Sequence, residues 1–174
     1  MVKMVLWLLG ISGAGKSTLG VKLKEYCDQL KKQSWIIDGD SIRDFFDNDL
    51  GFAREDRVQN IKRIMLAAHV LSENGTIAIV CNISPFEELR QFARGKIKNY
   101  QQIYLKKNLE SSRRDDVKEV YKNHVGKTPV VGVDLQFDEP QNNDLVLDIE
   151  NETVEESFQK IKAHLKQKFP EQFK

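Results

Sequence analysis

The sequence predicts an α/β fold, a three-layer αβα sandwich built on a five-stranded parallel sheet. Short apolar runs of strand length alternate along the chain with longer stretches of helical period, which is typical of βαβ units. The apolar runs are nearly continuous in valine, isoleucine and leucine, as expected of strands that helices cover on both faces. A length of 174 residues fits one domain with a full core. We therefore expect a single domain over residues 1–174.

The first part of the chain predicts two strands and two long helices. Residues 2–9 form the first apolar run and predict the first strand. Residues 16–32 predict a helix, because their apolar side chains recur with a period of 3.6: Leu19, Leu23, Tyr26, Cys27 and Leu30. Residues 35–37 predict the second strand. Residues 56–74 repeat the helical pattern, and Gly75 follows where many helices end in a left-handed cap.

The second part predicts the remaining strands, at residues 76–80, 102–105 and 145–147. The stretch between residues 108 and 140 mixes a charged helical segment with glycine and proline, and we expect it to be an excursion from the compact core. Thr153 and Glu156 have the spacing of a capping box ahead of Phe158, Ile161 and Leu165. A final amphipathic helix is therefore expected to pack on the sheet.

Composition excludes several classes of partner. Lysine plus arginine (27) nearly cancels aspartate plus glutamate (26), so there is no general positive field to attract nucleic acid or an anionic membrane. The longest apolar run, residues 4–9, is too short to span a bilayer, and the N-terminus lacks the pattern of a signal peptide. Cys27 and Cys81 are isolated in the sequence and are expected to be reduced thiols. We expect a cytoplasmic protein whose partner is a small molecule.

Directly after the first predicted strand, residues 10–17 read GISGAGKS and match the pattern GxxxxGK[ST] at every fixed position. In this segment, called here the phosphate loop, backbone N–H groups and a helix N-terminus are expected to bind a polyphosphate. Lys16 would reach the β- and γ-phosphates and Ser17 would ligate Mg²⁺. The alternative is a glycine-rich turn with a surface lysine. The motif favours ATP or GTP binding by Gly10, Ser12, Gly13, Ala14, Gly15, Lys16, Ser17 and Thr18.

A second polar cluster follows the second predicted strand. Asp38, Asp40 and Arg43 lie at the carboxyl edge, where parallel sheets bind their ligands. A period of two would place both carboxylates on the same side, one to hold a magnesium-bound water and one to accept a proton from an attacking hydroxyl. The alternative is a polar turn that caps the next helix. Beside a phosphate loop, the cluster favours phosphoryl transfer.

Several segments together resemble the adenylylsulfate kinases, P-loop kinases that phosphorylate the ribose 3′-hydroxyl of adenosine 5′-phosphosulfate with MgATP. The similar segments are GISGAGKSTL, DGDSIR, DLGFAREDRVQNIKR at residues 49–63, ISPF at 83–86 and FDEPQNNDLVLD at 137–148. They occur in the family's order and cover most of the chain. The resemblance implies a P-loop kinase sandwich with a helical lid, at about residues 108–137, and it suggests a homodimer. We call residues 108–137 the lid segment.

The resemblance also implies roles for individual residues. Asp40 would be the base for the ribose hydroxyl and Asp38 would help to hold Mg²⁺, so that Asp40, Asp38 and Lys16 are the implied catalytic residues. Arg43, Arg57 and Asn60 would hold the phosphate and sulfate side of the acceptor, and two arginines do suit a diphosphate-like anion. Phe52 would stack on the acceptor base, and Ile83 and Ser84 would contact it. Core packing is the alternative for Phe52, and a solvated helix face is the alternative for Arg57 and Asn60.

The match departs from the family pattern at the base pocket and in the lid segment. Val130 stands where the family has a second stacking phenylalanine, and Asn82 stands where a bulky residue is customary. Loss of one base–aromatic stack costs about 1–3 kcal/mol, so these departures bear on the acceptor base. In the lid segment, Arg114 and Lys118 are candidate contacts to ATP, with a solvated charged helix as the alternative.

Four functions therefore remain open at this stage. Adenosine 5′-phosphosulfate is the favoured acceptor, and cytidine diphosphoramidate, a smaller nucleotide with a similar mixed anhydride, is the alternative acceptor. A small-metabolite kinase acting on shikimate, gluconate or a nucleoside would not need Phe52 or the segment around Arg57. A module that only binds nucleotide would not need Asp38 and Asp40.

Overall fold

The computed structural model describes residues 3–116, 119–122 and 128–174, and its centre is a parallel sheet of five strands. The strands run in the order β2-β3-β1-β4-β5, and every neighbouring pair is parallel. Their bounds are Val5–Leu9 for β1, Ser34–Asp38 for β2, Ile77–Cys81 for β3, Tyr100–Lys106 for β4 and Leu145–Asp148 for β5. The predicted fold class is confirmed.

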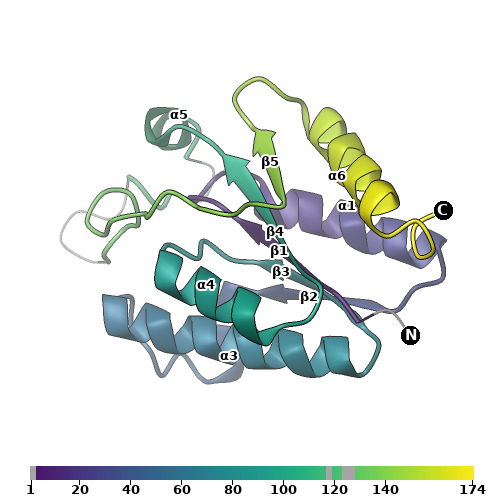
Figure 1. Ribbon diagram of the computed structural model, residues 1–174. Coiled ribbons are helices and arrows are strands. Elements are labelled where there is room, and N and C mark those ends of the chain that lie inside the picture. Colours follow the sequence, from purple (N-terminus) through teal and green to yellow (C-terminus); the bar gives the residue numbers. More distant parts are fainter. Residues whose placement is uncertain (1–2, 117–118, 123–127) are drawn as a thin grey trace.

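Helices cover both faces of the sheet (Figure 1). Helices α1 (Lys16–Gln29) and α6 (Val154–Lys168) pack on one face. Helices α3 (Arg54–Glu73) and α4 (Glu87–Lys96) pack on the other. Adjacent residues of β1 alternate between the two cores, because Leu6 and Leu8 join the first core and Val5, Trp7 and Leu9 join the second. A continuous apolar run is therefore what a central strand requires.

Each expected strand is present, and the differences lie at the ends of the elements. The first predicted helix ends three residues earlier than expected, at Gln29 instead of Lys32. Lys31 takes a left-handed conformation (φ 55°), and the backbone N–H of Lys32 donates to the carbonyl of Cys27. This turn closes the helix without the glycine that usually signals such an end. In α6 the capping box of Thr153 and Glu156 is confirmed.

Two helices were not predicted. Helix α2 (Gly39–Phe45) begins directly after β2, with Asp38 as its N-cap. Helix α4 was missed because half of its sequence, EELRQFARGK, is charged and it buries only Leu89, Arg90 and Ala93. The charged helical segment expected in the lid segment is present as α5 (Leu109–Arg114).

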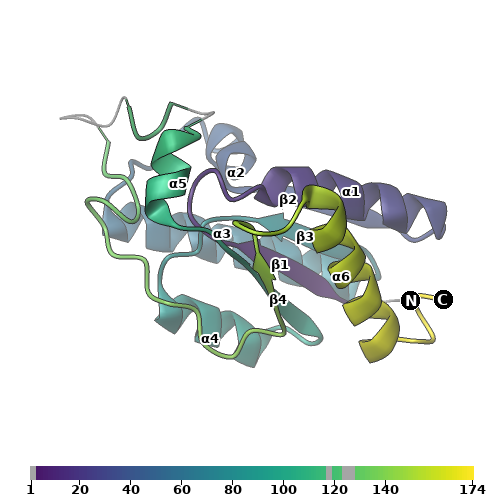
Figure 2. The ribbon, with the colours of Figure 1, turned by 90° about the horizontal axis from the view of Figure 1, so that it is seen from above.

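Between α5 and β5 the described residues form turns and an isolated bridge between Val131 and Leu135. Figure 2 shows α5 and this part of the lid segment standing at the end of the sheet where β1 leads into α1. Cys27 in α1 and Cys81 in β3 are buried free thiols, as predicted. Within the described ranges, no helix combines the length and the apolar character needed to cross a bilayer.

Candidate active site

A cavity of about 620 Å³ opens at the carboxyl edge of β1, β2 and β3. The phosphate loop, the start of α2, the start of α3, the turn after β3 and the lid segment all contribute to its wall. Most of the predicted site residues line it: Ser12, Gly13, Gly15, Lys16, Ser17, Thr18, Asp38, Asp40, Arg43, Phe52, Arg57, Asn60, Asn82, Ile83 and Val130. The structure thus brings together residues that lie up to 118 positions apart, from Ser12 to Val130.

The phosphate loop has the backbone that its glycines predict. Gly13 and Gly15 have φ angles of 81° and 88°, in the left-handed region that favours glycine. At Gly10 a Cβ atom would lie 2.6 Å from the carbonyl oxygen of Leu105, so a larger residue does not fit between β1 and β4. The Lys16 ammonium donates to the carbonyls of Gly10 and Ile11, at 2.9 and 2.8 Å. Lys16 is therefore folded over the loop.

Two braces of the phosphate loop were missed at the sequence level. The Lys107 ammonium, just after β4, donates to the carbonyl of Gly13 at 3.3 Å. The Tyr121 hydroxyl, from the lid segment, donates to the carbonyl of Ser12 at 3.1 Å. The backbone N–H of Tyr121 in turn donates to Asp116 Oδ2 at 2.9 Å. No spacing rule marks Lys107 or Tyr121, because their contacts span 94 and 109 residues.

The two carboxylates of the second cluster meet by a different route from the one expected. The period-two argument for Asp38 and Asp40 was wrong, because β2 ends at Asp38 and Asp40 lies in the first turn of α2. Both nevertheless line the cavity. Asp38 Oδ1 accepts from the backbone N–H of Asp40 at 2.9 Å, and Asp38 Oδ2 accepts from the Ser17 hydroxyl at 3.4 Å. The polar-turn interpretation is also correct, because Asp38 is the N-cap of α2.

Two guanidinium groups gather around Phe52. Those of Arg43 and Arg57 lie 4.4 and 5.4 Å from the centre of its ring. Arg43 donates to the carbonyls of Leu50 and Gly51. Arg57 donates to the carbonyl of Phe52 at 2.9 Å and to that of Pro129 at 2.7 Å. Phe52 itself is 40% exposed, so it is not the core plug of the alternative interpretation.

The electrostatics of this pair suit an anion. Burial first, and then the charge of Arg43, lower the pKa of Arg57 to about 10, and the charge of Asp40 opposes this shift. Burial is also the main cause that lowers the pKa of Arg43. Both groups stay protonated near neutral pH, and carbonyl dipoles are their main hydrogen-bond partners among the described residues. A dianion with paired acceptor oxygens would complement this local positive charge.

The remaining acceptor-side residues lie on α3, in the turn after β3 and in the lid segment. Asn60 is 3% exposed, donates to the carbonyl of Gly39 at 3.2 Å, and has a buried Oδ1 with no hydrogen-bond partner among the described residues. It is therefore not part of a solvated face. Ser84 is buried and is not among the residues that line the cavity, and its hydroxyl accepts from Trp7 Nε1 at 2.8 Å. Val130 is buried and forms part of the cavity wall.

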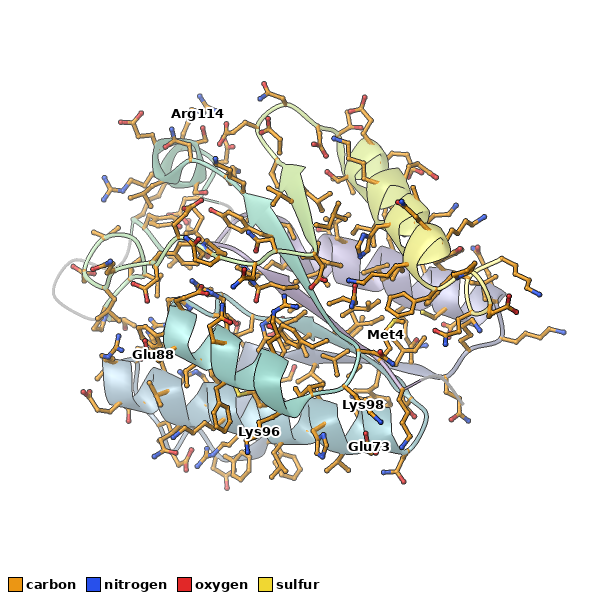
Figure 3. All side chains as sticks on the ribbon, in the orientation of Figure 1. Met4, Glu73, Glu88, Lys96, Lys98 and Arg114 are labelled. Carbon is orange, nitrogen blue, oxygen red and sulfur yellow. The ribbon has the colours of Figure 1, made fainter. Side chains whose placement is uncertain are left out.

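Three predicted residues besides Ser84 are not part of the described cavity wall. Gly10 and Ala14 belong to the phosphate loop but are buried away from the cavity: Gly10 lies against Leu105, and Ala14 is 1% exposed. Arg114 lies on α5 at the edge of the molecule (Figure 3), and its nearest partner is the adjacent Asp115, at 3.3 Å. Lys118 lies outside the described residues. The roles of Arg114 and Lys118 toward ATP stay predictions.

Comparison with known proteins decides the family. Residues 2–148 match the family model for adenylylsulphate kinase. The chain belongs to the adenylylsulphate kinase family. Among its relatives is the adenylyl-sulfate kinase of Oceanobacillus iheyensis, 36% identical over 168 residues, which make up 94% of this chain and 84% of the relative. That of Halothermothrix orenii is 37% identical over 167 residues, covering 93% of this chain and 89% of the relative.

Solved structures agree with the family assignment. One is the APS kinase CysC of Mycobacterium tuberculosis, solved in complex with AMPPNP and APS. It has a TM-score of 0.87 at 28% identity, and the match covers 95% of this chain and 98% of the CysC chain. A gluconokinase from Sinorhizobium meliloti has a TM-score of 0.65 at 14% identity, which reflects the shared fold. This adenylylsulphate kinase family member is thus an ATP-dependent kinase that transfers phosphate to a hydroxyl group.

Proposed function

We propose that this kinase transfers the γ-phosphate of ATP to the ribose 3′-hydroxyl of adenosine 5′-phosphosulfate. The observation that carries the proposal is a single cavity lined both by the phosphate loop and by the arginine pair around Phe52. One end of this cavity has the groups that bind a polyphosphate, and the other has the groups that bind a second anion. The relatives named above as adenylyl-sulfate kinases support the choice of acceptor.

In this proposal the phosphate loop holds ATP through its backbone N–H groups. Lys16 is bound to carbonyls of its own loop, at 2.8 and 2.9 Å, and would exchange them for phosphate oxygens. Such an exchange places a positive charge where negative charge develops during phosphoryl transfer. Lys107 and Tyr121 would keep the loop in shape, because they donate to the carbonyls of Gly13 and Ser12.

The Ser17 hydroxyl and the Asp38 carboxylate fit a magnesium ion. Both groups present hard oxygen ligands, and their oxygens lie 3.4 Å apart beside the phosphate loop. A magnesium ion held there would neutralise charge on the β- and γ-phosphates. Asp38 has a second task, since its other oxygen caps α2 and thereby fixes the backbone of Asp40.

Asp40 is the proposed proton acceptor. It lies in the first turn of α2, is exposed, and lines the same cavity as the phosphate loop and the arginine pair. A carboxylate in this place can take the proton of an attacking ribose hydroxyl. Arg43 and Arg57 would hold the phosphosulfate so that this hydroxyl meets the γ-phosphate, and Phe52 would stack on the base.

One observation favours a second acceptor, cytidine diphosphoramidate. Among the described lining residues Phe52 is the only aromatic side chain, and the wall at Val130 is aliphatic. A single stacking surface favours a base smaller than adenine. The same arginine pair would hold this nucleotide's diphosphate-like anhydride.

The test is ADP release by the purified protein with MgATP and each acceptor in turn. We expect turnover with adenosine 5′-phosphosulfate, and ³¹P NMR of the product should show a new phosphomonoester on the ribose. CDP serves as a control acceptor without a mixed anhydride. Turnover confined to cytidine diphosphoramidate would replace the first proposal by the second, and no turnover with either would refute both.

A further inference from the structure

Asn82 is one of the residues that line the cavity. It follows β3 directly, and its backbone N–H donates to the carbonyl of Leu8 at 3.2 Å, which fixes it to the sheet. Its side chain is half-buried and lines the cavity together with Ile83 and Pro85. Phe52, the proposed stacking surface for the acceptor base, lines the same cavity.

The hydrogen bonds of the turn determine which way the Asn82 carboxamide points. Its Oδ1 accepts from the backbone N–H of Ser84 and from the Ser84 hydroxyl, both at 2.9 Å. The backbone N–H is only a donor. The hydroxyl accepts from Trp7 Nε1, which is only a donor, and its own hydrogen is available for Asn82 Oδ1. A rotated carboxamide would face these donors with its own NH₂ group, so this orientation is the satisfied one.

The NH₂ group of Asn82 therefore points away from Ser84. Nδ2 lies only 2.5 Å from the place where a Cβ on Gly39 would be, so glycine at position 39 makes room for it. Among the residues that the structure describes, none accepts a hydrogen bond from this NH₂ group. The turn itself needs only Oδ1, which an aspartate would supply equally well.

We propose that Asn82 is a specificity-determining residue whose NH₂ group donates a hydrogen bond to the base of the acceptor nucleotide. The inference rests on the proposed function, since it takes the acceptor to be a nucleotide. Adenine and cytosine both present acceptor atoms at their edges, ring nitrogens in both and a carbonyl oxygen in cytosine. A base stacked on Phe52 would turn such an edge toward the cavity wall, where Asn82 offers an oriented donor.

The test compares three variants with the wild type. Asn82→Asp keeps the oxygen that holds Ser84 and replaces the donor by a second acceptor. Asn82→Leu removes the donor without adding charge. Asn99→Asp is the matched control, because Asn99 is exposed just before β4, where its side chain donates to the carbonyl of Lys3 at 2.9 Å. Thermal melting verifies that each variant folds, and kcat and KM are measured for ATP and for the acceptor separately.

We expect both Asn82 variants to lower kcat/KM for the acceptor by about 10- to 100-fold, the range for a lost or repelled hydrogen bond in a desolvated site. KM for ATP should stay that of the wild type, and Asn99→Asp should leave every parameter unchanged. Equal acceptor kinetics for Asn82→Asp and Asn99→Asp would overturn the inference. So would a rise in KM for ATP that matches the rise for the acceptor.

The wild-type measurement keeps the two proposals apart. Turnover with cytidine diphosphoramidate alone would refute the adenosine acceptor, and the Asn82 variants would then be judged on the cytidine acceptor. Turnover with neither nucleotide would refute the proposed function, and the inference about Asn82 would fall with it.

Discussion

Arg90 of α4 joins the turn after β3 to the segment that follows the lid segment. It is 2% exposed, and its guanidinium donates to the carbonyls of Ser84 and Asp138, both at 2.6 Å, and to the carboxylate of Glu87 at 2.7 Å. Ser84 belongs to the turn after β3, and Asp138 follows the lid segment. We predict that Arg90→Ala destabilises the protein strongly, because three acceptors lose their donor at once.

The size of the effect follows from burial. Removing the guanidinium leaves the two buried carbonyls without their donor, whereas Glu87 is 24% exposed and keeps hydrogen bonds from Gln91 and from the backbone N–H of Gln141. The two carbonyls alone account for about 3 kcal/mol or more, at about 1.5–3 kcal/mol for each hydrogen bond to a charged group. For a domain of this size a loss of 3–5 kcal/mol lowers Tm by about 6–20 °C.

The assay is urea unfolding of Arg90→Ala beside Arg54→Ala. Arg54 also pairs with a glutamate, Glu88, but the two side chains are 48% and 58% exposed. We expect this control to cost about 1 kcal/mol or less, the usual value for a surface ion pair. An equal loss in the two variants would refute the argument that burial makes Arg90 different.

Three further predictions concern the site and the sheet. Asp40→Asn should lower kcat by about 10²- to 10⁴-fold, the range for losing a general base, while calorimetry shows unchanged binding of an ATP analogue; wild-type turnover would remove Asp40 from the mechanism. Gly10→Ala should destabilise the protein and weaken ATP binding, because its Cβ would lie 2.6 Å from the Leu105 carbonyl oxygen. Gly95→Ala is the control, since Gly95 lies in α4 with nothing within 4 Å of a Cβ, and it should stabilise the protein by about 0.5–1 kcal/mol. Thermal melting measures both variants, and equal shifts in Tm would contradict the steric argument. His164 has a pKa lowered below its ordinary value of 6.5 by burial and by Lys168. The unfolded chain then binds the proton more readily, so stability should fall as pH drops below 6.5, and His164→Gln should remove part of this pH dependence of Tm; an identical slope in the variant would exclude His164 as its source.

Much of the fold follows from local pattern. The strands were predicted because central parallel strands read as short apolar runs, and β1 buries every side chain from Val5 to Leu9. The phosphate loop was predicted because its glycines and Lys16 must lie next to one another in the chain to do their work. Helix α4 escaped prediction, since half of its residues are charged and it packs on the sheet through few apolar side chains.

The acceptor side was only partly predictable. Arg43, Phe52 and Arg57 were identified through a resemblance to a family, and their contacts with each other depend on how α2 and α3 pack. Lys107 and Tyr121 were not identified, because each acts on a loop that lies about a hundred residues away in the chain. The period-two argument for Asp38 and Asp40 was wrong because a helix begins between them.

By itself, the sequence determined the succession of the five strands along the chain, the helices α1, α3 and α6, the nucleotide-binding loop and the charge types that face it. Those properties depend on residues close together in the chain, where backbone geometry fixes the spacing. Only the tertiary structure decided that Arg57 reaches the carbonyl of Pro129, that Arg90 joins Ser84 to Asp138, and that the Asn82 NH₂ group points toward Gly39. Hydrogen-bond direction depends on every donor and acceptor around a group, and packing brings these from distant segments.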